Sequence, residues 1–222
     1  MTTEGKLVLY IGEKNISSWS MRGWLAMHIK ELSFEERTIE LRTDKDRRQR
    51  REVSPTGRVP VLRHGDLAIP DSLAIIEYLE ETFPAPKHPS LWPTEKSARA
   101  HARWLAAAMH SGFLKLREGM SFNLCFLPTP PKPPQEAVQE AAEMLGYLED
   151  ALSRKQAQGT FLFGGFGAVD AMFAPAVVRL TSFDVPTQRA PRAAAYLQAV
   201  LNHPPVARWL QEARALPPRE TY

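Results

Sequence analysis

A proline-rich stretch at residues 83–93 divides this chain into two parts with different patterning. It holds four prolines within eleven residues. Proline lacks a backbone N–H and fixes φ, so neither a helix interior nor a central strand runs through such a stretch. Strand and helix patterns alternate before it, and only helical patterns follow it. We therefore predict one domain over residues 1–83, a linker over residues 84–93 and a second domain over residues 94–222.

The first domain combines short apolar runs with amphipathic helical stripes. Their order is β-α-β followed by β-β-α, which predicts a small mixed sheet with helices packed on it. The predicted strands cover residues 7–11, 33–41, 59–62 and 67–69, and the predicted helices cover residues 20–32 and 73–82.

The second domain carries apolar residues at helical spacing, apart from a proline-rich loop at residues 128–134 that must interrupt the helices. We expect a helical bundle, so the predicted fold class is α/β followed by all-α. The predicted helices cover residues 94–117, 135–156, 168–180, 191–201 and 204–213.

Composition excludes several function classes. Cys125 is the only cysteine, so the chain forms neither an intrachain disulfide nor a four-cysteine zinc site. The six histidines have no HExxH spacing, and no metal site is predicted. The start of the chain is polar and no apolar run approaches a membrane span, so we expect a cytoplasmic protein without membrane contact.

Charge gives little support for a nucleic-acid partner. The net charge is only +3, and acidic residues dilute the basic run between Arg42 and Arg51. No aromatic residue for base stacking lies within that run. We interpret the run as a solvated helix or loop, with a site for an anionic small molecule as the alternative.

Three stretches of the first domain carry the candidate chemistry. The first, Ser17-Ser18-Trp19-Ser20, lies between the first predicted strand and the first predicted helix. One serine is needed there to cap the helix, but capping does not explain three. A hydroxyl at a helix N-terminus favours an anion, so this position suits a thiolate that a cofactor supplies.

The second and third stretches contain Val59-Pro60 and Asp71-Ser72. A proline in an apolar strand lies at an edge, at the strand start or in a cis turn. A cis bond would turn the backbone of Val59 towards an extended, peptide-like ligand, and a mere edge strand is an equal alternative. Asp71 or Ser72 caps the next helix, where a free serine hydroxyl can also bind a carboxylate.

Taken in order, these stretches resemble the glutathione S-transferase family. Its members place Tyr, Ser or Cys at the first helix, then a turn with a Val-Pro pair, then an acidic-Ser pair at the following helix. No cysteine lies near the first helix, so the chain is most similar to serine-type members, including bacterial proteins and the zeta class with its SSCS run. The resemblance extends from about Lys6 to Ala213 and includes residues 109–117, 161–170 and 202–209.

The resemblance implies a thioredoxin-like first domain that binds glutathione as a cosubstrate. Ser17 would activate the glutathione thiol, and Ser18 is the alternative. The other implied contacts follow the tripeptide along its length: Asp71 and Ser72 at the γ-glutamyl end, Val59 and Pro60 at the cysteinyl backbone, and Arg42 or Arg58 at the glycyl carboxylate.

The resemblance also implies a homodimer, and a pocket for a hydrophobic, electrophilic small molecule. Candidate walls of this pocket are aromatic and basic side chains of the first helix and of the predicted helix at residues 94–117. Packing in the core or between domains is the alternative for each of them: Trp19, His110, Phe113 and Arg117.

Conjugation of glutathione to an electrophile is the predicted reaction. Fold alone does not choose among reactions, so other glutathione-dependent chemistry stays open. The alternatives are maleylacetoacetate-type isomerisation, peroxide reduction, dehalogenation and a non-catalytic binding role.

Gly167 departs from the family pattern. Members usually place Ser or Thr at this helix cap, three residues before the acid that matches Asp170. Glycine at an N-cap is only a few tenths of a kcal/mol, roughly, less favourable than serine. We interpret Asp170 as a structural residue that binds backbone N–H groups of the preceding loop.

Overall fold

The computed structural model describes residues 5–41, 44–154 and 158–219, and in these ranges one mixed sheet forms in the order β2-β1-β3-β4. β1 runs parallel to β2 and antiparallel to β3, and β3 pairs antiparallel with β4. The predicted mixed sheet is therefore confirmed. Its strands are β1 (Leu7–Gly12), β2 (Glu35–Ile39), β3 (Val61–His64) and β4 (Leu67–Ile69).

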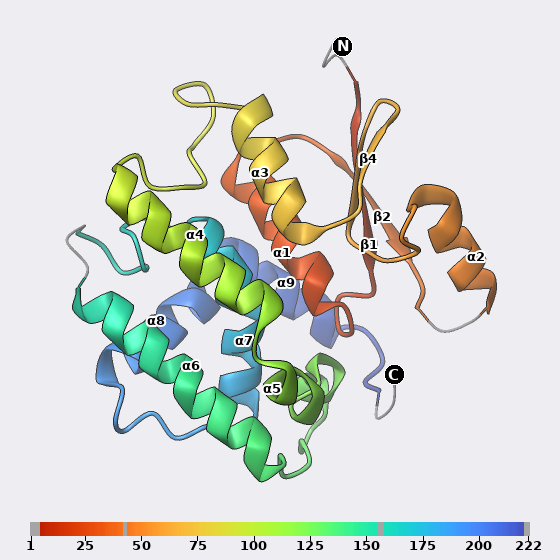
Figure 1. Ribbon diagram of the computed structural model, residues 1–222. Coiled ribbons are helices and arrows are strands. Elements are labelled where there is room, and N and C mark those ends of the chain that lie inside the picture. Colours follow the sequence, from red (N-terminus) through yellow and green to blue (C-terminus); the bar gives the residue numbers. More distant parts are fainter. Residues whose placement is uncertain (1–4, 42–43, 155–157, 220–222) are drawn as a thin grey trace.

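Helices α1 (Ser18–Ile29) and α3 (Ser72–Thr82) lie on one side of this sheet, and α2 (Asp44–Val53) lies on the other (Figure 1). Trp24 and Leu25 of α1 are fully buried, as the apolar stripe of this helix predicts. Arg48 and Arg51 of α2 are exposed, so the described part of the basic run forms a solvated helix, one of the predicted alternatives.

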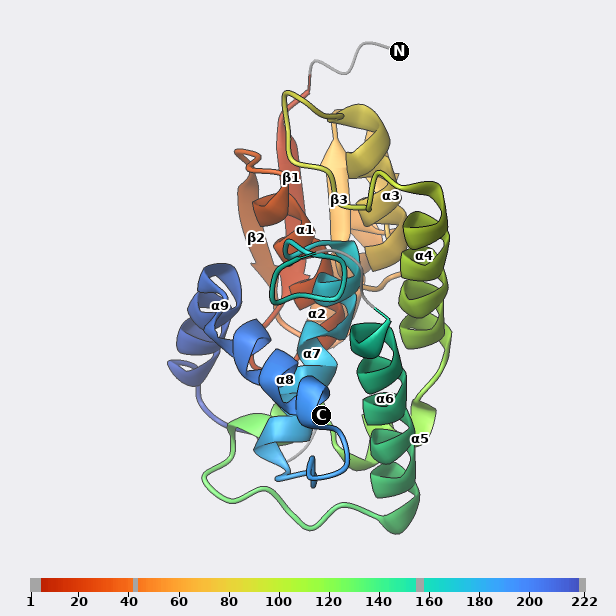
Figure 2. The ribbon, with the colours of Figure 1, turned by 90° about the vertical axis from the view of Figure 1, so that its left-hand side faces the viewer.

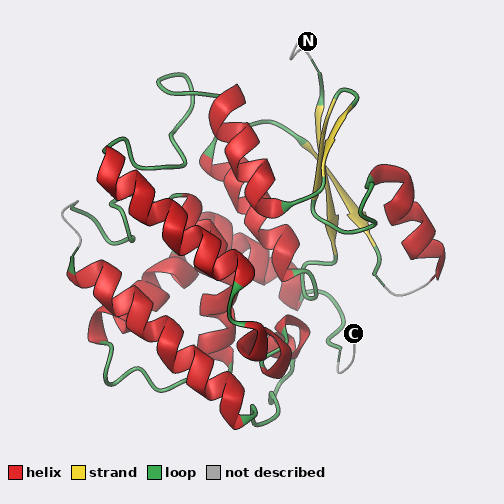
Figure 3. Cartoon of the chain, viewed as in Figure 1, coloured by secondary structure: helices red, strands yellow, loops and turns green. Residues whose placement is uncertain are grey.

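The second half of the described chain is helical and packs below the sheet domain in the view of Figure 2, with the strands confined to one end of the molecule (Figure 3). Helix α7 is its centre, because every residue from Ala168 to Leu180 is buried. The helices are α4 (Lys96–Ser111), α5 (Leu114–Gly119), the 3-10 helix η1 (Phe122–Phe126), α6 (Gln135–Ser153), α7 (Ala168–Ser182), α8 (Pro191–Asn202) and α9 (Pro204–Arg214).

The prediction of one helix over residues 94–117 is wrong. Gly112 ends α4 and adopts an extended backbone, and Phe113 follows in the left-handed region with φ of 57°. A side chain at Gly112 would lie 2.8 Å from the carbonyl oxygen of Ala108. The chain therefore turns here and restarts as α5, which packs against α6.

Asp170 has the structural role that the sequence predicts. Its Oδ1 accepts the Leu162 N–H at 3.3 Å, and its Oδ2 accepts the Gly167 N–H at 2.8 Å. Burial raises the pKa of this carboxyl to about 6. Among the helices in the described ranges, none is both long enough and apolar enough to cross a bilayer.

Candidate active site

A cleft of about 1000 Å³ opens between the sheet domain and the helical domain. One wall consists of the loop before α1, the loop before β3 and the start of α3. The other consists of side chains from α4, α5 and α7. Most of the predicted site residues line this cleft: Ser17, Ser18, Trp19, Arg58, Val59, Pro60, Asp71, Ser72, His110 and Arg117.

Ser17 is the N-cap of α1, and its hydroxyl faces both the helix end and Ser20. Its Oγ accepts the Ser20 N–H at 3.3 Å and lies 2.7 Å from the Ser20 Oγ. The Ser20 Oγ also accepts the Gly12 N–H at 3.0 Å. When Ser20 donates its proton to Ser17, the Gly12 N–H, the Ser20 N–H and the Ser20 hydroxyl all have partners, and the Ser17 proton is left to point into the cleft.

Ser18 has a different neighbour. Arg179 of α7 donates from Nη2 to the Ser18 Oγ at 3.2 Å, across the boundary between the two domains. Arg179 is itself buried, and its other described donations go to the carbonyl oxygens of Met120 and Pro175. The Ser18 hydroxyl is therefore polarised by a guanidinium, while the Ser17 hydroxyl is polarised by a second serine.

Asp71 and Ser72 form the cap of α3 and retain binding capacity. The Asp71 Oδ1 accepts the N–H groups of Leu73 and Ala74 at 2.8 and 2.9 Å, while Oδ2 lies 3.4 Å from the His110 Nε2. The Ser72 Oγ is buried and has no hydrogen-bond partner in the described part of the protein. A buried hydroxyl without a partner at a cleft wall is suited to a ligand that supplies one.

The Val59-Pro60 peptide bond is cis, as one of the predicted alternatives requires. Among the described residues, neither the N–H nor the C=O of Val59 has a hydrogen-bond partner. Arg58 is exposed at the cleft rim, and beside it Arg50 donates to the carbonyl oxygens of Gly57 and Glu40. The other predicted basic residue, Arg42, lies outside the residues that the structure describes.

Trp19 lies at the domain boundary among cationic side chains. The guanidinium of Arg22 is 4.3 Å from its ring centre, and that of Arg117 is 5.3 Å away. The His110 ring meets Trp19 edge-on at 5.3 Å. Burial lowers the pKa of His110, and the nearby Arg22 and Arg117 lower it further against the effect of Asp71.

Phe113 does not join the residues that line the cleft. Its ring is buried and packs edge-on against Tyr147 of α6, at a centroid distance of 5.8 Å. The prediction of Phe113 as a pocket wall is therefore replaced by its alternative, core packing, because the turn at Gly112 directs this ring into the bundle.

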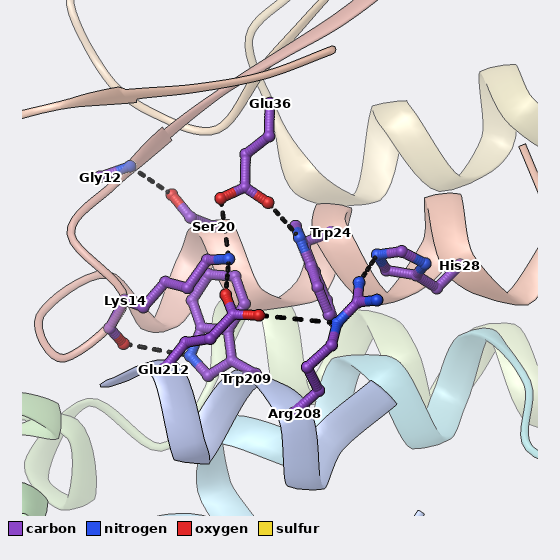
Figure 4. A network of polar contacts seen from close by, with 9 residues as sticks. All are labelled: Gly12, Lys14, Ser20, Trp24, His28, Glu36, Arg208, Trp209 and Glu212. Atoms are coloured by element: carbon purple, nitrogen blue, oxygen red, sulfur yellow. Dashed lines mark hydrogen bonds and ion pairs between the residues drawn. The ribbon is translucent and has the colours of Figure 1, made fainter. Parts of the chain in front are cut away.

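A polar network fixes the loop that precedes Ser17 (Figure 4). Lys14 forms ion pairs with Glu36 of β2, at 2.7 Å, and with Glu212 of α9. The Trp209 Nε1 donates to the Lys14 carbonyl oxygen at 3.1 Å. Arg208 of α9 contacts the His28 ring. Burial, followed by the positive charge of Arg208, lowers the pKa of His28 to about 4.

Sequence reasoning missed three residues at this site: Ser20, Arg22 and Arg179. Arg179 carried a usable signal, because it is the only basic residue in the apolar run from Ala168 to Leu180. Ser20 carried none beyond helix capping, since its contact with Ser17 depends on the exact start of α1. Arg22 lies on the same turn as Trp19, but only the packed structure reveals its burial.

The cysteine of the chain does not line the cleft. Cys125 of η1 is half-buried, and burial raises the pKa of its thiol to about 11. A thiol with so high a pKa is a poor nucleophile at neutral pH. Within the described ranges, no three His, Cys, Asp or Glu side chains are grouped as metal ligands would be.

Two family profiles match the chain. The glutathione S-transferase N-terminal domain matches residues 13–87, which contain the sheet domain's half of the cleft. The glutathione S-transferase C-terminal domain matches residues 104–199, which contain α5 and α7. Both walls of the cleft are therefore built from segments that this family shares.

Individual relatives agree with the profiles. A probable maleylacetoacetate isomerase from Caenorhabditis elegans is 35% identical over 111 residues, 50% of this chain and 50% of that protein. Glutathione S-transferase 1 from Dianthus caryophyllus is 42% identical over 80 residues, 36% of this chain and 35% of that protein. The chain thus spans about half the length, or less, of these curated relatives.

A solved structure extends the likeness to nearly the whole chain. A glutathione transferase homologue from Burkholderia, solved with bound glutathione, superimposes with a TM-score of 0.70 and 28% identity. The match covers 96% of this chain and 100% of that one. Its arrangement of a sheet domain and a helical domain is the arrangement described above.

Proposed function

Since this chain belongs to the glutathione S-transferase family, we propose that it binds glutathione in the cleft and directs the glutathione thiolate at an electrophilic small molecule. The observation that carries the proposal is the set of unused polar groups along one wall. The Ser17 hydroxyl, the backbone of Val59 and the Ser72 hydroxyl each have binding capacity facing the same cleft.

These groups match glutathione along its length. The buried Ser72 hydroxyl suits the γ-glutamyl carboxylate, and the Asp71 oxygen that faces His110 suits the γ-glutamyl amine. The unpaired Val59 N–H and C=O suit the cysteinyl backbone, with Pro60 holding the turn. The glycyl carboxylate would meet Arg58, with Arg50 beside it at the cleft rim.

A serine hydroxyl at a helix N-terminus can supply enough free energy to ionise the glutathione thiol. A free thiol has a pKa of about 8.5 and is only a few per cent ionised at pH 7, and the thiolate is the nucleophile. Lowering this pKa by about two units corresponds to about 2.7 kcal/mol. One charge-assisted hydrogen bond contributes about 1.5–3 kcal/mol, and the helix N-terminus adds about 0.3–1 kcal/mol. No general base is required.

Ser17 is our candidate for the hydroxyl that donates to sulfur. Its oxygen is able to accept two hydrogen bonds from Ser20, which leaves its proton for the cleft. Ser18 is the alternative, and its contact with Arg179 would also polarise its hydroxyl.

Isomerisation is the second candidate reaction, because curated relatives from Caenorhabditis elegans and Vibrio cholerae are named as probable maleylacetoacetate isomerases. Both reactions use the same glutathione thiolate. Product analysis with haloarenes and with maleyl compounds distinguishes them.

We also propose a homodimer in the cytoplasm, and sedimentation velocity measures the oligomeric state.

The decisive experiment is an ultraviolet difference titration of bound glutathione in the wild type and in Ser17→Ala. We expect Ser17→Ala to bind glutathione but to raise the thiol pKa by about one to two, since one charge-assisted hydrogen bond is lost. Turnover falls with it. Unchanged thiol ionisation and turnover would transfer the role to Ser18, and calorimetry without any glutathione binding would reject the function itself.

A further inference from the structure

Arginines gather at the inner end of the cleft without carboxylate partners. Arg117 of α5 and Arg179 of α7 both line the cleft, and Arg22 of α1 is buried against the Trp19 ring. None of the ion pairs between described residues involves any of these three arginines. We call Arg117, Arg179 and the Ser18 hydroxyl the arginine pocket.

The contacts of these arginines are neutral. Arg179 donates to two carbonyl oxygens and to the Ser18 hydroxyl. Arg117 makes one long contact of 3.4 Å, to the His110 carbonyl oxygen. The Nε and Nη1 of Arg22 are buried and have no hydrogen-bond partner among the described residues. Unused donors therefore remain on the buried Arg22 and on the half-buried Arg117.

Such an arrangement is unfavourable without an anion. Burial, followed by the charges of Arg179 and Arg117, lowers the pKa of Arg22 to about 9 against the effect of Asp71. Burial likewise lowers the pKa of Arg179 to about 10. Proteins normally pair buried charges, because an unpaired buried charge loses its hydration without compensation.

The acidic residues nearby do not neutralise the pocket. Asp71 caps α3 through one oxygen and faces His110 with the other. Glu140 accepts the Leu116 N–H at 2.9 Å. Glu140 and Glu118 both act to raise the pKa of Arg117, yet burial still lowers it.

We propose that the arginine pocket binds a carboxylate of the second substrate, so that this protein selects acidic electrophiles. The proposal rests on the proposed function, and it narrows the expected second substrate from a hydrophobic electrophile to one that also carries a carboxylate. Arginine is suited to this task because its planar fork matches the two oxygens of a carboxylate. Trp19 would pack against the apolar body of the same molecule.

Position distinguishes this carboxylate from those of glutathione. The glutathione carboxylates have their own groups, at Ser72 and at the Arg58 rim. The arginine pocket instead joins the helical domain to Ser18, the residue next to the proposed thiolate donor Ser17. An acid held there would keep its reactive carbon within the half of the cleft that faces the sulfur.

The reaction leaves this carboxylate unchanged. With 4-chloro-3-nitrobenzoate as the probe, the thiolate attacks the carbon that bears chlorine. A C–S bond forms, the C–Cl bond breaks and chloride leaves with the electron pair. The ring carboxylate only positions the molecule, so its contribution is measurable by binding alone.

The test compares 4-nitrobenzoate with 4-nitrobenzamide, which has a similar shape but no charge. Calorimetry measures the affinity of each for the full chain, with and without S-methylglutathione. We expect the wild type to bind the benzoate about tenfold more tightly or better, the size of one charge-assisted contact. In Arg117→Gln the two affinities should lie within about threefold of each other.

Two further variants make the test specific. Arg179→Gln should remove the preference for the benzoate, and if it fails to fold, Arg117→Gln alone decides. Arg103→Gln is the matched control, because Arg103 is an exposed arginine of α4 that pairs with Glu77. It should retain the wild-type preference.

Three results would overturn the proposal. The wild type could bind the benzoate and the benzamide with equal affinity, or Arg117→Gln could weaken the binding of both compounds equally. Arg117→Gln could also lose affinity for glutathione while it still prefers the benzoate. The last would assign Arg117 to glutathione. Absence of glutathione binding would instead reject the proposed function, and the titration without S-methylglutathione would still report on the arginine pocket.

Discussion

Ser20 acts on the proposed thiolate site without reaching the cleft wall itself. It is fully buried behind Ser17, and its hydroxyl connects the Gly12 N–H to the Ser17 oxygen. A hydroxyl has one proton to donate, so a Ser20 hydroxyl that accepts from Gly12 and donates to Ser17 requires the Ser17 proton to point elsewhere. When Ser20 donates to Ser17, the orientation of the Ser17 proton depends on a residue that does not line the cleft.

Ser20→Ala should reveal this positioning role in two measurements. The buried Gly12 N–H loses its acceptor, so urea unfolding should report a loss of about 1–3 kcal/mol. The thiol pKa of bound glutathione should rise, but less than in Ser17→Ala, because the Ser17 hydroxyl is still present. Ser111→Ala removes an exposed helical serine and should change neither quantity. A destabilised Ser20→Ala protein with an unchanged thiol pKa would leave Ser20 a purely structural residue.

Helix α9 reaches back to the sheet domain and holds the loop that leads into α1. In Figure 4 the Lys14 amine lies between Glu36 of β2 and Glu212 of α9. It also lies 5.1 Å from the Trp24 ring centre and 5.3 Å from that of Trp209. One buried amine therefore joins β2, α1 and α9.

Lys14→Met should destabilise the protein by about 2 kcal/mol in urea unfolding. This is less than the roughly 3–5 kcal/mol of a broken, fully buried pair, because the Glu212 side chain is 44% exposed. Lys6→Met is the matched control. Lys6 pairs with Glu35 of the same strand at 2.6 Å but is exposed, so its loss should change stability by less than about 1 kcal/mol. Equal effects of both substitutions would mean that α9 contributes nothing through Lys14.

At the level of elements, local patterns predict the strands and most helices, but they leave α2 open as a helix or a loop, do not predict η1 and fail where the chain turns within a helical pattern. The apolar spacing of residues 94–117 predicts one helix, and the alanine-rich sequence offers no visible stop before Gly112. Glycine within a helix is only mildly unfavourable, so sequence alone does not distinguish a tolerated glycine from a turn. The left-handed backbone of Phe113 decides it, and that depends on where its ring packs.

At the level of the whole molecule, the site divides into a predictable and an unpredictable wall. The sheet-domain wall carries short motifs, such as Val59-Pro60 and Asp71-Ser72, whose chemistry is local. The opposite wall depends on contacts between distant segments, as in the bond from Arg179 to Ser18. Sequence spacing does not report such contacts, so the arginine pocket and the place of Phe113 required the structure.

The linker is part of this whole-molecule arrangement. Lys30, the C-cap residue of α1, is fully buried and pairs with Glu80 of α3 at 2.5 Å. Glu80 accepts the Leu91 N–H at 2.9 Å, and the Leu91 carbonyl accepts the Ala168 N–H at 2.8 Å. A continuous set of polar contacts thus connects the sheet domain, through the linker, to the central helix of the bundle.

This connection explains the glycine at the cap of α7. A side chain at Gly167 would begin 2.9 Å from the Leu91 carbonyl oxygen, a backbone atom that its bond to Ala168 holds in place. Serine is the better N-cap, yet Gly167→Ser and Gly167→Ala should each destabilise the protein by about 1–3 kcal/mol, because the linker has to move.

Gly146→Ala is the control. Its site in α6 has no atom within 4 Å, so alanine should stabilise it by up to about 1 kcal/mol. Urea midpoints measure all three, and a higher midpoint for Gly167→Ser would mean that capping outweighs the contact with the linker.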